Sequence, residues 1–90
     1  MSFTRNLYYR RHGRTPVNFG DAWFGIPHAD GSVQVSTVFL GIDHGYETMV
    51  FWDGHDLDQE QERYWTYCEA EDGHAAMVER VKTAWEAKKS

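Results

Sequence analysis

The sequence has little cysteine and no long hydrophobic run, and each shortage excludes a class of protein. A single cysteine, Cys68, can form neither an internal disulfide nor a cysteine-based zinc site. A chain without a disulfide framework is typical of a reducing compartment, so we expect a cytoplasmic protein. No apolar run approaches the roughly 20 residues that a membrane helix needs. The N-terminus has arginines but no apolar core, so we expect neither a membrane anchor nor a secretory signal.

The sequence also lacks the short motifs of common enzyme classes. It contains no G-x-S-x-G, no P-loop and no dinucleotide-binding fingerprint. Histidines and carboxylates that suit a divalent metal occur at residues 43–44 and again at residues 53–60. The two groups fall at opposite ends of a predicted hairpin that rises about 3.3 Å per residue, so one ion cannot easily use both. We therefore expect a protein that is not an enzyme, with no catalytic, metal-binding or cofactor-binding residue; a small metal-dependent enzyme is the third hypothesis.

The composition is that of one small folded domain. The chain has 90 residues, of which 41% are hydrophobic and 26% are charged, and this balance argues against disorder. A chain of this length buries only about 60–65% of its unfolded surface, so its core is thin. We divide the single domain, residues 1–90, into a basic N-terminal segment (1–20), antiparallel strands (21–66) and a C-terminal helix (67–90).

Residues 33–52 are predicted to form the hairpin around which the chain is organised. Both halves are rich in β-branched and aromatic residues, and a turn at His44-Gly45, where glycine adopts positive φ at low cost, pairs Val38 with Phe51. Side chains alternate between the two faces of a strand. One face then carries Val38, Leu40, Ile42, Met49 and Phe51, and the other carries Val33, Val35, Thr37, Phe39, Thr48, Val50 and Trp52. Both faces are apolar, so we expect the hairpin at the centre of its sheet and covered on both sides.

A C-terminal helix of about residues 67–88 is predicted behind a capping box, Thr66-x-x-Glu69. Its apolar stripe at helical spacing consists of Ala70, His74, Met77, Val78, Val81, Ala84 and Trp85. We expect His74 to be a hydrogen-bonded core residue, Cys68 to be a buried thiol, and Gly73 to let the helix approach the sheet closely. With short strands at 21–28 and 63–66, the fold class is α+β: a small antiparallel sheet of about four strands with one helix packed on one face.

This arrangement leaves one face of the hairpin without a predicted cover. The N-terminal segment, a second copy of the chain or a protein partner has to cover it, and a large uncovered apolar face is an association site. Because aromatic side chains are enriched at interfaces, Phe39 and Trp52 are candidate interaction residues. We therefore expect a protein partner or self-association as a homo-oligomer. In the alternative, residues such as Leu7 and Trp23 fold back and close the core within one chain.

The N-terminal segment suggests a second function, nucleic-acid association. Arginine on phosphates and tyrosine on bases would bind a nucleic acid, and the candidate residues are Arg5, Tyr8, Tyr9, Arg10, Arg11 and Arg14. The net charge of −5 opposes this hypothesis, because nucleic-acid binders carry basic patches and usually a positive total. Residues 43–72 hold ten acidic residues and one arginine, a balance of −9 that can steer a basic partner.

Three stretches carry a resemblance to a known family: VSTVFLGIDH (residues 35–44), ETMVF (47–51) and RYWTYCEAEDGHAAMVERV (63–81). Together they resemble a family of small uncharacterised proteins of bacteriophages and prophages. The resemblance implies a phage-type accessory protein in the cytoplasm of a bacterial host cell, with a possible place in host takeover or counter-defence. It implies no activity and no catalytic residue.

Overall fold

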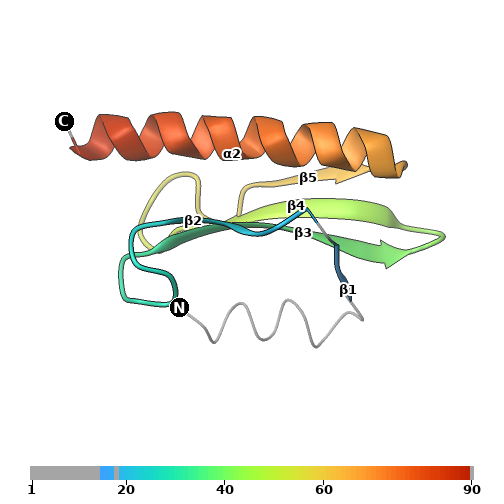
Figure 1. Ribbon diagram of the computed structural model, residues 1–90, viewed down its shortest axis with the longest axis horizontal. Coiled ribbons are helices and arrows are strands. Elements are labelled where there is room, and N and C mark those ends of the chain that lie inside the picture. Colours follow the sequence, from blue (N-terminus) through green and yellow to red (C-terminus); the bar gives the residue numbers. More distant parts are fainter. Residues whose placement is uncertain (1–14, 18, 90) are drawn as a thin grey trace.

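One long helix lies along one face of an antiparallel sheet (Figure 1). The computed structural model describes residues 15–17 and 19–89. Its elements are β1 (Thr15–Pro16), β2 (Ala22–Phe24), β3 (Val33–Gly41), β4 (Gly45–Phe51), β5 (Gln61–Tyr64) and α2 (Tyr67–Lys89). This is the α+β class that the sequence predicts, with the helix bounds within one residue of those expected.

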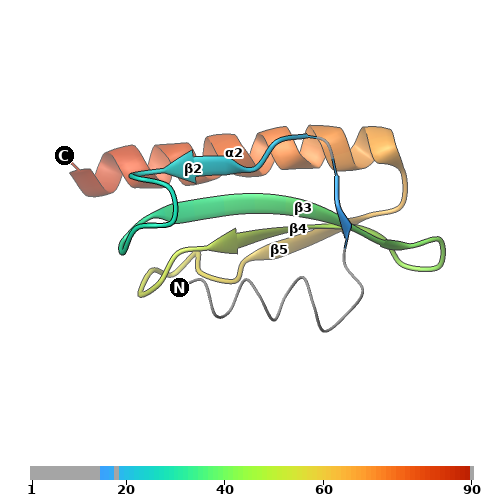
Figure 2. The same cartoon turned by 60° about the horizontal axis from the view of Figure 1, so that its bottom comes forward.

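The hairpin of β3 and β4 is central in the sheet, as predicted. The strand order is β1-β3-β4-β5, and β2 also pairs with β3. Because β4 takes one edge of β3, β1 and β2 share its other edge, and the sheet is four strands wide (Figure 2). The sequence predicts a loop at residues 15–20, and this is wrong at its start: Thr15–Pro16 pairs with Val38 and Phe39. Proline is compatible with such an edge position, where its missing N–H is not needed.

The register of the hairpin differs from the predicted one. Val38 lies opposite Glu47, and Phe51 lies opposite Gln34, so the pairing is shifted by four residues. The cause is the turn, which occupies residues 42–44 and is flanked by Gly41 at φ 112° and Gly45 at φ 72°. Since the shift is an even number of residues, the side chains within β3 and β4 stay on their predicted faces; Ile42, which was predicted on the Val38 face, lies in the turn instead and is exposed.

The main core lies between the hairpin and α2. Its buried members are Val33, Val35, Val50, Trp52, Met77 and Val81. The predicted capping box starts the helix: the Glu69 N–H donates to Thr66 Oγ1 at 3.1 Å, and the Thr66 N–H donates to Glu69 Oε1 at 3.2 Å. The predicted stripe of α2 covers one apolar face of the hairpin, as expected, and this face is the one that carries Val33, Val35, Val50 and Trp52.

The face of the hairpin away from α2 is closed as well. Val38 is 0% exposed, Phe51 is 3% exposed and Glu47 is 1% exposed within the single chain. The burial of these side chains thus supports the alternative in which a single chain covers both faces of the hairpin. A case for a partner cannot depend on an uncovered face of β3 and β4.

Candidate functional site

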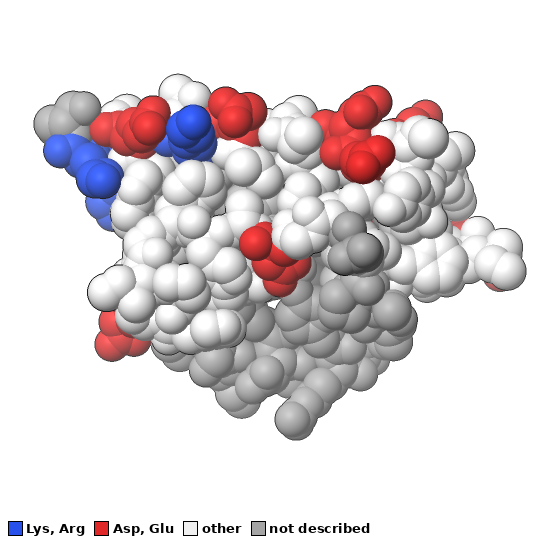
Figure 3. Space-filling model, in the orientation of Figure 1, with Lys and Arg blue, Asp and Glu red and all other residues white. Residues whose placement is uncertain are grey.

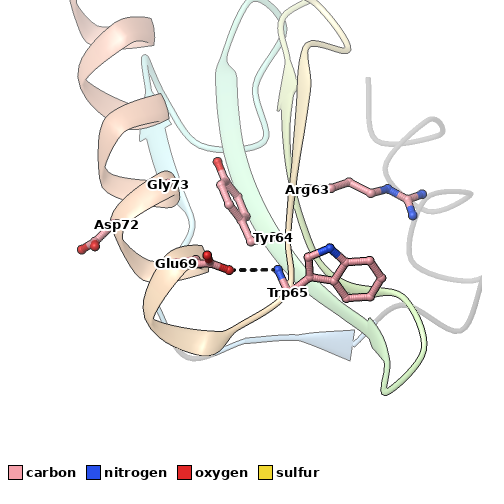
Figure 4. A pocket seen from close by; sticks show the side chains of 6 residues that line it. All are labelled: Arg63, Tyr64, Trp65, Glu69, Asp72 and Gly73. Carbon is pink, nitrogen blue, oxygen red and sulfur yellow. Dashed lines mark hydrogen bonds between the residues drawn. The ribbon is translucent and has the colours of Figure 1, made fainter.

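A groove runs between the last strand and the helix (Figure 4). Its first part, about 480 Å³, is lined by Arg63, Tyr64, Trp65, Glu69, Asp72 and Gly73. Its second part, about 320 Å³, is lined by Glu62, Tyr64, Gly73, Ala76, Met77 and Arg80. Because Tyr64 and Gly73 border both parts, we treat them as one site, the β5–α2 groove.

Tyr64 packs directly against Gly73 at the middle of this groove. Alternation along β5 turns Tyr64 toward α2 and Arg63 away from it (Figure 4). A Cβ atom on residue 73 would overlap the ring and hydroxyl of Tyr64. The expectation that Gly73 allows a close approach between helix and sheet is therefore confirmed, and the approach is made by one aromatic side chain.

Replacing Gly73 by alanine is expected to lower the free energy of unfolding by about 1–2 kcal/mol. Overpacking against Tyr64 costs about 1–3 kcal/mol, and the better helix propensity of alanine returns only up to about 1 kcal/mol. In a Tyr64→Ala background the overlap is absent, so the same change should stabilise the protein by up to about 1 kcal/mol. Urea unfolding of the four proteins in this cycle measures both values. A Gly73→Ala effect with the same sign in both backgrounds would contradict the packing.

A chain of hydrogen bonds leads from the groove into the core. The Tyr64 hydroxyl bonds the side chain of Thr48, whose Oγ1 lies 2.5 Å from Thr37 Oγ1. Thr37 Oγ1 lies 2.7 Å from His74 Nδ1, and His74 also bonds the backbone of Gly20. Which of the two atoms, Thr37 Oγ1 or His74 Nδ1, donates the hydrogen depends on the tautomer of the ring. His74 is the hydrogen-bonded core histidine that the sequence predicts.

Burial lowers the pKa of His74, because the charged ring is poorly solvated there; Gly20 and Asp21 act in the opposite direction but more weakly. A histidine with a lowered folded pKa binds fewer protons than the unfolded chain as pH falls. Its contribution to stability is complete above the unfolded pKa of about 6.5 and is lost as pH falls toward the folded value.

We therefore expect the free energy of unfolding to fall between about pH 7 and pH 5, and this fall to be smaller in His74→Gln, which has no titrating ring. His44→Gln is the matched control, because His44 is exposed in the hairpin turn. Urea unfolding across this pH range provides the measurement. An unchanged slope in His74→Gln would remove His74 as the cause.

The groove is acidic because its two arginines are already paired. Arg63 Nε lies 3.3 Å from Glu47 Oε2, and an Arg80 guanidinium nitrogen lies 2.7 Å from Glu60 Oε2. Within the described residues no basic side chain pairs with the other carboxylates of the groove, Glu62, Glu69 and Asp72. Glu62 also raises the pKa of Tyr64, after the larger effect of burial. Acidic side chains continue along the outer side of α2 (Figure 3).

Large apolar side chains are exposed at the end of the groove. Trp65 is 72% exposed in the β5–α2 connection, and Tyr67 is 49% exposed in the first turn of α2. Ile42, in the hairpin turn, is 92% exposed. The turn and the start of α2 lie at the same end of the molecule (Figure 1). Ile26, 76% exposed in the β2–β3 loop, lies at the other end.

The interaction residues expected from sequence fall into three groups in the structure. The six candidate residues between Arg5 and Arg14 lie outside the described residues. Phe39 is half-buried and packs on Tyr46, with ring centroids 5.1 Å apart. Trp52 is 2% exposed and stacks on His55, so its ring belongs to the core and is not available to a partner.

Two further expectations concern chemistry. Cys68 is exposed in the first turn of α2, so the expectation of a buried thiol is wrong. In residues 15–17 and 19–89 no cluster of three or more histidine, cysteine or carboxylate side chains could hold a metal ion.

Sequence reasoning missed Trp65 as an exposed residue. Its position in the sequence could have indicated the exposure: Trp65 lies between the end of a strand and a helix cap, where no other element covers its side chain.

No helix in the described part of the chain is long and apolar enough to cross a membrane. Comparisons with protein-family models, with curated proteins and with solved structures found no match.

Proposed function

We propose that the protein is a non-enzymatic protein–protein interaction module whose contact surface is the end of the molecule around the β5–α2 groove. The observation that carries the proposal is the exposure of Trp65, 72%, beside a groove of about 480 Å³. Tryptophan is among the residues most enriched at binding hot spots, especially beside a pocket. Burying a large apolar side chain contributes about 1.5–3 kcal/mol, so Trp65 and Ile42 together can anchor a partner.

The setting of this module is proposed from the sequence. The resemblance to small phage and prophage proteins supports a phage-type accessory protein that acts in the bacterial cytoplasm on a host or phage protein. Self-association is the competing form of the same function, and the mass of the purified chain in solution tests it. Nucleic-acid association through the N-terminal segment remains the alternative; it predicts retention on a DNA column with a steep salt dependence.

The experiment compares protein capture by the wild-type chain with capture by two surface variants. Trp65→Ala combined with Ile42→Ser removes both anchors, whereas Ile26→Ser removes a similarly exposed side chain at the opposite end. We expect bacterial lysate to yield a partner that the wild type and Ile26→Ser retain and the double variant loses. Equal capture by all three proteins would place the interaction elsewhere.

A further inference from the structure

We propose that the outer edge of β5 binds an extended, basic segment of a partner protein as an added strand of the sheet. The inference rests on the proposed function and gives it a binding mode and a partner chemistry. Strand addition to an exposed sheet edge is a common form of peptide recognition, in which backbone hydrogen bonds hold the peptide and alternate side chains select it. Three features of the groove favour it.

The first feature is the row of backbone groups at the edge of β5. β5 ends the strand order, and its pairing with β4 places Glu62 opposite Thr48 and Tyr64 opposite Tyr46. The Val50 N–H donates to the Glu60 carbonyl at 3.0 Å, which fixes the phase of this ladder. In an antiparallel pair the bonded residues alternate, so Glu62 and Tyr64 face β4 and the backbone groups of Gln61 and Arg63 face outward. Within the described residues no strand pairs with this edge.

The second feature is charge. Glu62, Glu69 and Asp72 border the groove without a basic partner among the described residues, while Arg63 and Arg80 are held by Glu47 and Glu60. A strand beside β5 places alternate side chains on the α2 side, next to Glu62 and below the first turns of the helix. Lysine or arginine at these positions complements the three carboxylates. A second copy paired through the same edge brings two sets of carboxylates together, which charge opposes.

The third feature is room for side chains on the α2 side. The two parts of the groove, about 480 and 320 Å³, lie on either side of Tyr64. Their walls include the aliphatic Ala76 and Met77 as well as the carboxylates. A long basic side chain can lay its methylene groups on such a wall and keep its charged end near Glu62 or Asp72.

The test uses three synthetic peptides of eight residues and fluorescence anisotropy. The first has lysine at alternate positions with valine and threonine between them. The second has glutamate in place of lysine. The third keeps the lysines but carries N-methyl groups on the amides that would pair with β5. We expect the first to bind, the second not to bind at the same concentration, and the third to bind at least about tenfold more weakly, since several backbone hydrogen bonds are lost.

Protein variants then locate the site. Asp72→Asn should weaken binding of the lysine peptide by about threefold to fivefold. Glu71→Gln changes the net charge equally at the neighbouring exposed helix position, outside the groove, and should leave binding nearly unchanged. Equal binding of the lysine peptide and its N-methylated form, or equal loss in the two variants, overturns strand addition in favour of unspecific charge attraction. If no peptide binds while capture of a protein still depends on Trp65, this inference fails and the proposed function stands; if both fail, so does the proposed function.

Discussion

Replacing Gly45 by alanine is expected to lower the free energy of unfolding by about 2–5 kcal/mol, the combined cost of a strained φ and of overpacking. Gly45 begins β4 at φ 72°, a conformation that residues with a Cβ rarely adopt. A Cβ atom there would also overlap the backbone carbonyl of Tyr64 and press on Trp65 Cα. Because the obstacle is backbone, β5 itself has to move away from β4.

Gly54→Ala separates these two costs. Gly54 has nearly the same φ, 79°, but a Cβ atom there meets nothing within 4 Å. Gly54→Ala should therefore lower the free energy of unfolding only by the cost of the strained φ, about 1–2 kcal/mol. Urea unfolding of both variants measures the difference. Equal costs for Gly45→Ala and Gly54→Ala would mean that β5 does not lie against Gly45.

Trp52→Ala is expected to have an effect of similar size, about 3–5 kcal/mol, because it empties a large volume in the core. Trp52 is 2% exposed and packs on Trp85, with ring centroids 6.1 Å apart. Trp65→Ala is the matched control, since the same side chain is removed from a position that is 72% exposed. Its effect on stability should lie within about 0.5 kcal/mol, as for other surface substitutions.

The pair also distinguishes fold from function. Trp65→Ala should unfold like the wild type and lose the captured partner, whereas Trp52→Ala should be far less stable. Thermal or urea unfolding gives the first comparison, and capture from lysate gives the second. A large loss of stability in Trp65→Ala would mean that this ring is part of the core, and the proposed anchor would then be withdrawn.

The fold could be predicted from sequence because each of its two main elements is indicated by a pattern within its own stretch of residues. Alternating apolar residues assign the faces of β3 and β4, and the capping box with its stripe assigns α2. The register could not be predicted, because it depends on a turn at residues 42–44 between two glycines of positive φ rather than on the strand residues. The even shift explains why the faces of the residues within β3 and β4 were still correct.

The candidate site could not be predicted, because it arises from packing between distant parts of the sequence. Tyr64 and Gly73 define the groove only once β5 lies beside α2. The acidic character of the groove likewise depends on which carboxylates pair with Arg63 and Arg80. Sequence reasoning named Trp52 as a contact residue and did not name Trp65; in the structure Trp52 is buried against Trp85 of α2, whereas Trp65 is exposed.

Amide hydrogen exchange along β5 tests the central claim, an unpaired strand edge that accepts a basic segment, most directly. In the free protein the amides of Glu62 and Tyr64, which face β4, should exchange slowly, and those of Gln61 and Arg63 should exchange fast. Addition of the lysine peptide should slow exchange at Gln61 and Arg63. Slow exchange of these two amides before the peptide is added, or no change after it, would contradict the account.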